Sequence, residues 1–364
     1  MKAIALHRDA DNVDLIEMPE PGLREGEVMI QAIRTGVCGT DRELIERHKV
    51  DAPPGEEFLV IGHEGLGRVV DMRGEVSRLR RGDLVVPVVR RGCGECNACL
   101  TGHADYCYTG RYTERGIHKQ HGFFSEFYAD RPEYLAVALP EAEDVAVLGE
   151  PMSVSVKAVG IALDFQARVR FEGAFSRKGV RERVLIAGHG PIGMLGLLLF
   201  LEMGFEVWVL GRRPPGDPQV QMIESVGARY ARTEEVEDEV RRTGGFFIIF
   251  EATGLSEVTF QLATYLSRNG VLLLTGVPRG PKPIQIDGNT LMASLVRFNQ
   301  GIIGSVNACA GCFQSALASL GRFKREHPEF MRRMFTSRYT LADWPEAFSG
   351  KGRDDIKVTV EFAE

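Results

Sequence analysis

Hydrophobic and polar positions divide the chain into two parts with different periodicity. Up to about residue 150, short apolar runs separated by Gly and Pro predict β-strands, among them residues 28–33, 67–70 and 83–88. Residues 1–22 alternate apolar and polar positions and predict a first strand. From Arg183 onward, strand-length apolar runs alternate with helix-length segments, which is typical of βαβ units and a parallel sheet. We therefore expect an α/β protein whose first part is mostly β.

The second part contains a regular succession of such segments. Strands are expected at residues 184–187, 206–210, 246–251, 270–276 and 301–306, and helices at 192–203 and 219–225. A charged and weakly patterned stretch at 165–182 suits a helix that crosses from one part to the other.

Composition fits a soluble protein of two domains. A chain of 364 residues is too long for one ordinary core, and 44% apolar with 26% charged residues is a globular balance. The net charge of -6 offers no basic field to a phosphate backbone, so no nucleic acid partner is expected. The N-terminus lacks the apolar stretch of a secretory signal, and no uncharged run has the length of a membrane span. We expect no membrane contact and a cytoplasmic location.

A GxGxxG motif follows the apolar run at 184–187. Gly188 permits a tight turn, Gly190 lets the backbone approach a pyrophosphate, and Gly193 allows close packing of helix on strand. Pro191 and Ile192 lie between the last two glycines, where the helix begins. The alternative is a Gly-rich turn without a ligand, but the second strand at the expected distance favours a dinucleotide site.

That second strand ends in Gly211, Arg212 and Arg213, about twenty residues past the motif. Sites that prefer NAD carry an acidic residue there for the ribose 2′-hydroxyl. Two guanidinium groups instead suit a 2′-phosphate, because Arg forms bidentate, charge-assisted hydrogen bonds to phosphate oxygens. The sequence thus favours NADP; a pair of solvated surface arginines and use of NAD as well remain the alternatives.

Four of the seven cysteines lie within fifteen residues and predict a metal site. Tetrahedral thiolate coordination by Zn²⁺ would leave no open position, so the site should be structural. An iron–sulfur cluster or free thiols are the alternatives. The four ligands would be Cys93, Cys96, Cys99 and Cys107. A separate pair, Cys309 and Cys312, has no partner cluster nearby in sequence and is expected to be two core thiols.

The order of the motifs resembles the medium-chain zinc alcohol dehydrogenase family over nearly the whole chain. The motifs are VCGTD at 37–41, GHEG at 62–65, the four-cysteine segment, GEP at 149–151 and the GxGxxG. The resemblance implies a catalytic zinc with Cys38 and His63 as ligands, Glu150 as a candidate ligand, and Glu64 as an exchangeable ligand or an outer carboxylate. An open zinc position would polarise an alcohol oxygen and lower its pKa. Thr40 would receive the proton of the substrate. Singly, each of these residues has an ordinary structural explanation.

Further details resemble the archaeal-type glucose dehydrogenases within this family, namely ERGI at 114–117, HGF at 121–123, GRR at 211–213 and GSVN at 304–307. The resemblance implies that Glu114, Glu150 and Asn307 hydrogen-bond sugar hydroxyls, and that an aldose, glucose first, is oxidised at C1 to a lactone. A site that pairs several hydroxyls rejects simple alcohols. Val89 and Val154 are apolar where some relatives carry polar sugar contacts, so the choice of aldose stays open.

Three rival functions are carried forward. The first is a polyol, secondary-alcohol or threonine dehydrogenase of the same architecture, because a fold does not fix a substrate. The second is a non-catalytic zinc and dinucleotide sensor, against which Cys38, His63 and Thr40 argue. The third is a zinc-ribbon nucleic-acid binder, against which the acidic balance argues.

The resemblance also sets the expected domains. A GroES-like, β-rich catalytic domain should comprise residues 1–175 and 305–364, with a helix at 313–323 and a strand at 358–362 in the returning segment. A Rossmann domain with a doubly wound parallel sheet should comprise residues 176–304. Further cofactor contacts are expected at Thr253, Val277 and Asn307. The expected partners are a small sugar and copies of the same chain, in a dimer or a tetramer.

Overall fold

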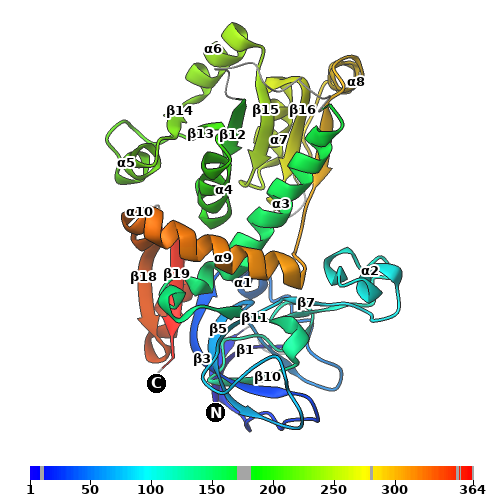
Figure 1. The fold of residues 1–364 in the computed structure, drawn as a ribbon, viewed down its shortest axis with the longest axis vertical. Helices are drawn as coiled ribbons and strands as arrows, with labels where there is room; N and C mark the ends of the chain where they lie inside the picture. Colours follow the sequence, from blue (N-terminus) through cyan, green and yellow to red (C-terminus); the bar gives the residue numbers. More distant parts are fainter. Residues whose placement is uncertain (9–11, 170–181, 279–281, 350–351, 353, 363–364) are drawn as a thin grey trace. The chain divides into compact units, whose positions relative to one another are not determined.

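The chain forms two compact units in the computed structural model, which describes residues 1–8, 12–169, 182–278, 282–349, 352 and 354–362 (Figure 1). Unit 1 comprises Met1–Ser153 and Asn307–Glu364, and unit 2 comprises Val154–Val306. The expected domain boundary at 175/176 lies outside the described residues. The second division, after Val306, falls two residues beyond the expected one.

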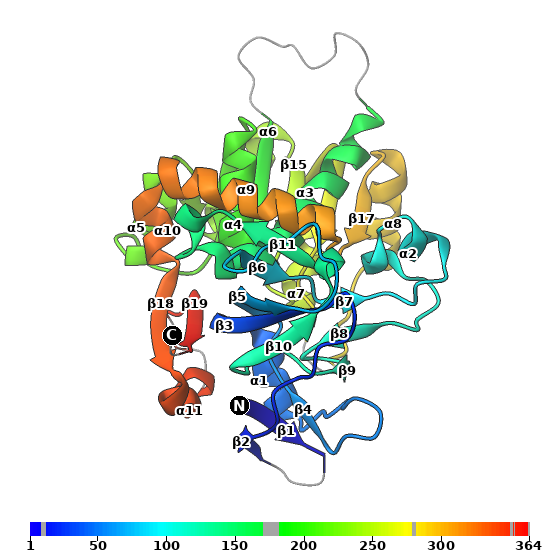
Figure 2. The ribbon, with the colours of Figure 1, turned by 60° about the horizontal axis from the view of Figure 1, so that its bottom comes forward.

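Unit 1 is built on β-sheets. Its largest sheet has seven strands in the order β11-β6-β5-β3-β19-β18, with β10 also paired to β3 (Figure 2). The strands of this unit are β1 (Lys2–His7), β2 (Val13–Glu17), β3 (Val28–Val37), β4 (Phe58–Val60), β5 (Glu64–Met72), β6 (Leu84–Pro87), β7 (Arg90–Arg91), β8 (Thr113–Arg115), β9 (Lys119–Gln120), β10 (Phe127–Asp130), β11 (Leu135–Ala138), β18 (Phe335–Thr340) and β19 (Lys357–Glu361). Its helices include α1 (Gly39–Glu46), α2 (Asn97–Leu100), α9 (Ala310–Glu326), α10 (Pro328–Arg333) and α11 (Trp344–Phe348), and among its 3₁₀ turns is η1 (Ala104–Tyr106).

The N-terminal segment corrects one prediction. The single strand expected over residues 1–22 is two antiparallel strands, β1 and β2, paired from Lys2 opposite Glu17 to Leu6 opposite Val13. The sequence between them, DADN at 9–12, has the composition of a turn, and this interrupts the alternation that suggested one strand. The inward faces of β1 and β3 supply Ile4, Leu6 and Ile30 to the core of unit 1.

Unit 2 is a parallel sheet with helices, as the sequence predicts. Its strand order is β14-β13-β12-β15-β16-β17, and all its strand pairs are parallel. Its elements are β12 (Arg183–Ala187), α4 (Pro191–Glu202), β13 (Glu206–Leu210), α5 (Pro218–Ser225), β14 (Arg229–Ala231), α6 (Thr233–Thr243), β15 (Phe246–Glu251), α7 (Ser256–Leu262), β16 (Leu266–Leu274), α8 (Gly288–Arg297) and β17 (Gly301–Gly304). The chain order reverses direction between the neighbours β12 and β15, which makes the ends of these strands the topological switch point.

The helix that leads into unit 2 is α3 (Gly149–Ala167). It begins well before the crossing helix expected at 165–182, of which residues 170–181 lie outside the described part. One helical span, Ala146–Ala167, is long and apolar enough to cross a membrane by length and composition, but 72% of its most apolar window is buried in the protein. A core helix of a soluble protein has the same properties.

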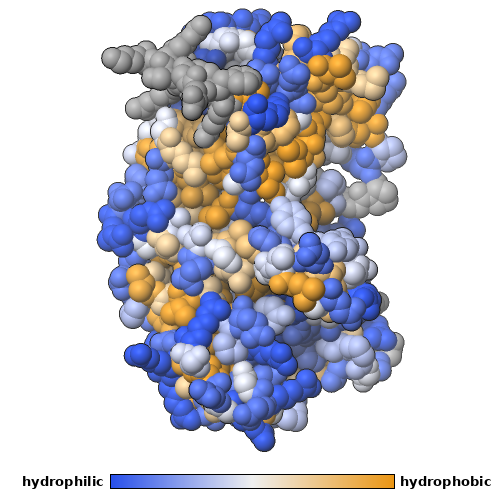
Figure 3. Space-filling view, turned by 45° about the vertical axis from the view of Figure 1, so that its right-hand side comes forward, coloured by the Kyte–Doolittle hydropathy of each residue, from blue (hydrophilic) through white to orange (hydrophobic). Residues whose placement is uncertain are grey.

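Apolar side chains also gather on the surface of unit 2. Figure 3 shows an apolar area on one face, and in the same unit α8 exposes Met292 and Val296 at 66% and 74%. The strand β17 ends the sheet order beside β16. Among the described residues, this edge of the sheet is therefore uncovered by a further strand.

Candidate active site and cofactor sites

Three metal-ligand side chains predicted from sequence lie together in unit 1. Cys38 follows β3 and caps α1, while His63 and Glu64 stand at the start of β5. Strands β3 and β5 are paired with Gly36 opposite Glu64, which brings the two segments side by side. One ligand atom from each of Cys38, His63 and Glu64 lies within 4.8 Å of the others. A thiol, an imidazole and a carboxylate at this separation form a donor set that suits zinc.

Asp41 orients this cluster, and the sequence reasoning missed it. Its Oδ2 accepts a 2.8 Å hydrogen bond from the backbone N–H of Cys38, and its Oδ1 lies 3.3 Å from Nδ1 of His63. Burial by itself lowers the pKa of His63, but Asp41 and Cys38 together outweigh burial and the pKa is raised well above its ordinary value. With Nδ1 facing Asp41, Nε2 is left for a metal, as in the carboxylate–histidine–zinc arrangement.

Lys357 completes the buried charges around the cluster. Its Nζ donates a short hydrogen bond to Oε2 of Glu64, and both side chains are almost fully buried. Burial by itself lowers the pKa of Lys357, but Glu64 and Cys38 outweigh it and the pKa is raised. A Cβ at Gly36 would lie 2.0 Å from the same Oε2, so this strand position has to be glycine for Glu64 to keep its place. Glu64 is thus held by an ion pair and by the backbone beside it.

Glu150 and Thr40 lie on the first turns of α3 and α1. The pKa of Glu150 is raised to about 7, mainly by burial; the charge of His63 acts to lower it and that of Glu64 to raise it. The charges of the cluster therefore affect the pKa of Glu150. Its carboxylate is nevertheless not part of the compact set formed by Cys38, His63 and Glu64. Its role as a ligand and the proton-transfer role of Thr40 stay predictions.

The two predicted sugar-binding residues meet across a long sequence separation. Nδ2 of Asn307 donates a 2.6 Å hydrogen bond to Oε1 of Glu114, and Asn307 adopts a left-handed backbone with φ of 57°. Arg90, which sequence reasoning missed, donates from Nε and Nη2 to the same oxygen at 3.1 and 3.0 Å. The turn after Glu114 packs tightly on the segment before His63. A Cβ added at Gly116 would lie only 2.2 Å from the carbonyl oxygen of Gly62, so no larger residue fits at this position. The polar pair is thereby fixed relative to the cluster.

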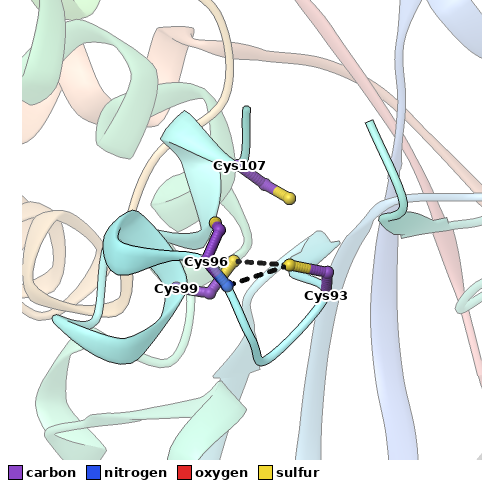
Figure 4. Close-up of side chains that lie close together, drawn as sticks. All are labelled: Cys93, Cys96, Cys99 and Cys107. Carbon is purple, nitrogen blue, oxygen red and sulfur yellow. Dashed lines mark hydrogen bonds between the residues drawn. The ribbon is translucent and has the colours of Figure 1, made fainter. Parts of the chain in front are cut away.

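The four-cysteine segment has the geometry of a closed zinc site. The sulfurs of Cys93, Cys96, Cys99 and Cys107 lie within 4.8 Å of one another, and Figure 4 shows them pointing toward a common centre. The Sγ atoms of Cys93 and Cys99 are 3.9 Å apart. Two sulfurs bound to one tetrahedral zinc, with bonds of about 2.3 Å, lie roughly 3.8 Å apart. A hydrogen bond from Thr109 is the main cause that lowers the pKa of Cys93 to about 6. The four residues fit a structural zinc.

The dinucleotide motif of unit 2 joins β12 to α4 at the switch point. Gly188 has φ of +100°, and a Cβ at Gly193 would lie 2.0 Å from the carbonyl oxygen of Gly188. Gly190 is the N-cap of α4 and Pro191 is the first residue of the helix. The backbone N–H groups of Ile192 and the residues after it therefore lie at the N-terminal end of the helix, next to the turn. The conformation fits a bound pyrophosphate for the reasons that the sequence predicts.

The two arginines after β13 differ in their surroundings. Arg212 is exposed, whereas Arg213 is buried and its Nη1 lies 2.9 Å from Oδ2 of Asp217, the N-cap of α5. The backbone N–H of Arg213 donates to the hydroxyl of Tyr230 at 2.8 Å, and a Cβ at Gly211 would lie 2.0 Å from that hydroxyl. Arg212 is therefore the better candidate for a 2′-phosphate, and Arg213 holds the loop.

The other predicted cofactor residues have mixed surroundings. Thr253 follows β15, and its N–H and hydroxyl both donate to Oε1 of the buried Glu251. Val277 is 71% exposed in unit 2. Asn307 belongs to unit 1. Their contacts with a cofactor stay predictions.

Comparisons with known proteins agree with these sites. Residues 24–141 match the family described as alcohol dehydrogenase GroES-like domain, and residues 143–362 match the one described as glucose dehydrogenase C-terminus. Together with the strand order of unit 2, these matches define a zinc-dependent medium-chain dehydrogenase with a GroES-like and a Rossmann part, as predicted. Within that class the chain belongs to the glucose dehydrogenase family.

Individual relatives match along their full length. The glucose 1-dehydrogenase of Methanocella arvoryzae is 35% identical over 100% of this chain and 99% of its own. Glucose 1-dehydrogenase 1 of Vulcanisaeta moutnovskia is 36% identical over 97% of this chain and 96% of its own. The glucose dehydrogenase of Haloferax mediterranei, solved in complex with NADP, Zn and gluconolactone, is 31% identical with a TM-score of 0.88 and covers 100% of both chains. The predicted family and enzyme class are confirmed.

Proposed function

We propose that this protein oxidises glucose at C1 to gluconolactone and transfers the hydride to NADP, with zinc at the Cys38, His63 and Glu64 cluster. The observation that carries the proposal is this cluster, in a chain that aligns end to end with glucose 1-dehydrogenases. The reaction removes a hydride from C1 and a proton from its hydroxyl, so glucose and NADP⁺ give lactone, NADPH and one proton.

Each group in the site has a separate task. Bound zinc would polarise the C1 oxygen, and bound NADP would accept the hydride. Cys38 and His63 hold the metal, and Asp41 fixes the ring of His63 through Nδ1. Thr40 takes the hydroxyl proton. Glu114 and Asn307, already hydrogen-bonded to each other, offer a carboxylate and an amide to other sugar hydroxyls.

The direct test is the initial rate of NADP and NAD reduction with glucose, galactose, xylose, a polyol and a simple alcohol, before and after chelation of zinc. We expect NADP reduction with an aldose, and its loss on chelation with recovery when Zn²⁺ is added back. Turnover of the polyol or simple alcohol alone would replace glucose with the rival substrate class. Dinucleotide binding without any turnover would favour the non-catalytic sensor.

Cofactor preference rests on Arg212. We expect Arg212→Ala to lower kcat/KM for NADP about 10- to 100-fold and to change that for NAD little, because a charged hydrogen bond to a 2′-phosphate is worth about 1.5–3 kcal/mol. The matched variant is Arg213→Ala, which removes the contact with Asp217 and should weaken both cofactors alike. Equal losses for NADP and NAD in Arg212→Ala would contradict the assignment.

We also propose that the chain forms a homo-oligomer through unit 2. Exposed Met292 and Val296 on α8, and the edge position of β17, support this face as the contact. Sedimentation velocity should give a mass that is a multiple of 40.3 kDa, and Val296→Glu should shift it toward the single chain. A wild-type protein that sediments as one chain would overturn the proposal.

A cytoplasmic location fits the seven cysteines, since thiols remain reduced there.

A further inference from the structure

A second group of metal-type donors lies in unit 1, apart from the two sites described above. It consists of His103 and Asp105, on either side of the first residue of η1, and Cys309, the N-cap of α9. One ligand atom from each lies within 4.8 Å of the others. Residues about 200 positions apart in the sequence therefore present a nitrogen, an oxygen and a sulfur to one point.

Cys312 lies next to one of these three donors, Cys309, and would have to move toward the other two to become a fourth ligand. Its backbone N–H donates to the carbonyl of Cys309 at 2.9 Å, which folds the first turn of α9 so that the two sulfurs are 3.3 Å apart. This is the CxxC pair that the sequence alone leaves as two core thiols. The structure places one member of the pair, Cys309, beside an imidazole and a carboxylate, which a core thiol pair does not require.

The site has both a rigid and an accessible side. Asp105 is buried, with 5% of its surface exposed, whereas the side chain of His103 is 54% exposed. A cavity of about 290 Å³ is lined by Ala104 and Cys309 among others, and it would give an ion a path to the sulfur of Cys309. A buried carboxylate next to two thiols favours a cation over further negative charge.

We propose that His103, Asp105, Cys309 and Cys312 bind a further zinc ion. Neutral imidazole, carboxylate and two thiolates make a tetrahedral set that zinc accepts. On binding, both thiols release their protons to solvent and the sulfurs move apart to about 3.8 Å, the tetrahedral separation. The ion would tie η1 to the start of α9, two residues after Asn307.

A disulfide between Cys309 and Cys312 is the competing use of this pair. It would need an oxidant such as hydrogen peroxide, which takes up the two electrons as both thiols lose their protons. Burial first, and then the neighbouring Cys309 and Asp105, together raise the pKa of Cys312 to about 12. The zinc content and the mass of the chain distinguish the two uses of the pair.

The test compares zinc content per chain in full-length protein purified without chelator. Cys309→Ser/Cys312→Ser should bind about one Zn²⁺ fewer than the wild type, and Ala310→Ser, in the same helical turn, should match the wild type. His103→Ala changes an exposed side chain, so it tests the site without loss of the fold. It should weaken zinc at this site at least about tenfold in competition with a chromophoric chelator.

Equal zinc content in the double variant and the wild type would overturn the proposal. So would a wild-type chain that is about 2 Da lighter than the fully reduced one, with the loss mapped to Cys309 and Cys312, because that is a disulfide. Unchanged chelator competition in His103→Ala would also contradict it. None of these measurements depends on turnover of glucose, so the outcome is separate from that of the proposed activity.

Discussion

Replacing His63 with alanine is expected to lower kcat/KM for glucose at least about 1000-fold, or roughly 4 kcal/mol of transition-state stabilisation. The imidazole is one of three donors within 4.8 Å of one another, so its loss would remove one of the proposed metal ligands and leave Cys38 and Glu64. Zinc content should fall by about one ion per chain. The rate of NADP reduction and the zinc content, measured on the same preparation, check both parts of the prediction.

Asp41→Asn is expected to have a smaller effect of the same kind as His63→Ala. The amide keeps the shape of the carboxylate but loses the charge that faces Nδ1 of His63 at 3.3 Å. Zinc affinity should fall about 10- to 100-fold, and added Zn²⁺ should restore much of the activity, whereas His63→Ala should not recover. If His63→Ala kept its zinc and its rate, the cluster would not be the catalytic metal site.

Those parts of the site that depend on local patterns could be predicted from the sequence. The GxGxxG follows a strand and opens a helix, and the four cysteines at 93–107 need only a short loop to converge. Cys38 is far along the chain from the adjacent pair His63 and Glu64, and only the family order of motifs brought the three together. Their contact comes from the pairing of β3 with β5, which a spacing argument does not contain.

The residues that support the ligands could not be predicted, because their roles arise in tertiary contacts. Asp41 had one local signal, its place three residues after Cys38 at the start of α1, a helix that the pattern did not indicate. Lys357 had none: β19 pairs with β3 so that Val358 stands opposite Val37, and this register puts the lysine beside Glu64. A single cation before an apolar run predicts a strand end rather than a buried ion pair.

Arg213 illustrates the limit of a motif with two similar residues. Both arginines after β13 suit a phosphate by charge, and sequence offers no means to separate them. The structure does so through packing, since Arg213 is buried against Asp217 while Arg212 is exposed. We therefore assign the proposed contact with the 2′-phosphate to Arg212 alone, while Arg213 holds the loop through Asp217.

Lys357→Met is expected to lower the free energy of unfolding of unit 1 by about 3–5 kcal/mol, because it leaves the Glu64 carboxylate buried without its partner. Trp208 lies in unit 2 and Trp344 in unit 1, and they are the two tryptophans of the chain. In a Trp208→Phe background, the fluorescence of Trp344 during guanidinium unfolding therefore reports on the unit that carries the ion pair.

The double variant Lys357→Met/Glu64→Gln separates the ion pair from simple loss of packing. Removing the charge of Glu64 as well should recover a large part of the lost stability, since the cost comes mainly from an uncompensated charge. The raised pKa of Lys357 means that its contribution is complete below the unfolded value of about 10.4 and is lost only as pH rises through the higher folded value. In zinc-free protein, the loss in Lys357→Met should therefore be the same at pH 6 and pH 8. A loss seen only in the zinc-loaded protein would instead make Lys357 a support for the metal rather than for the fold.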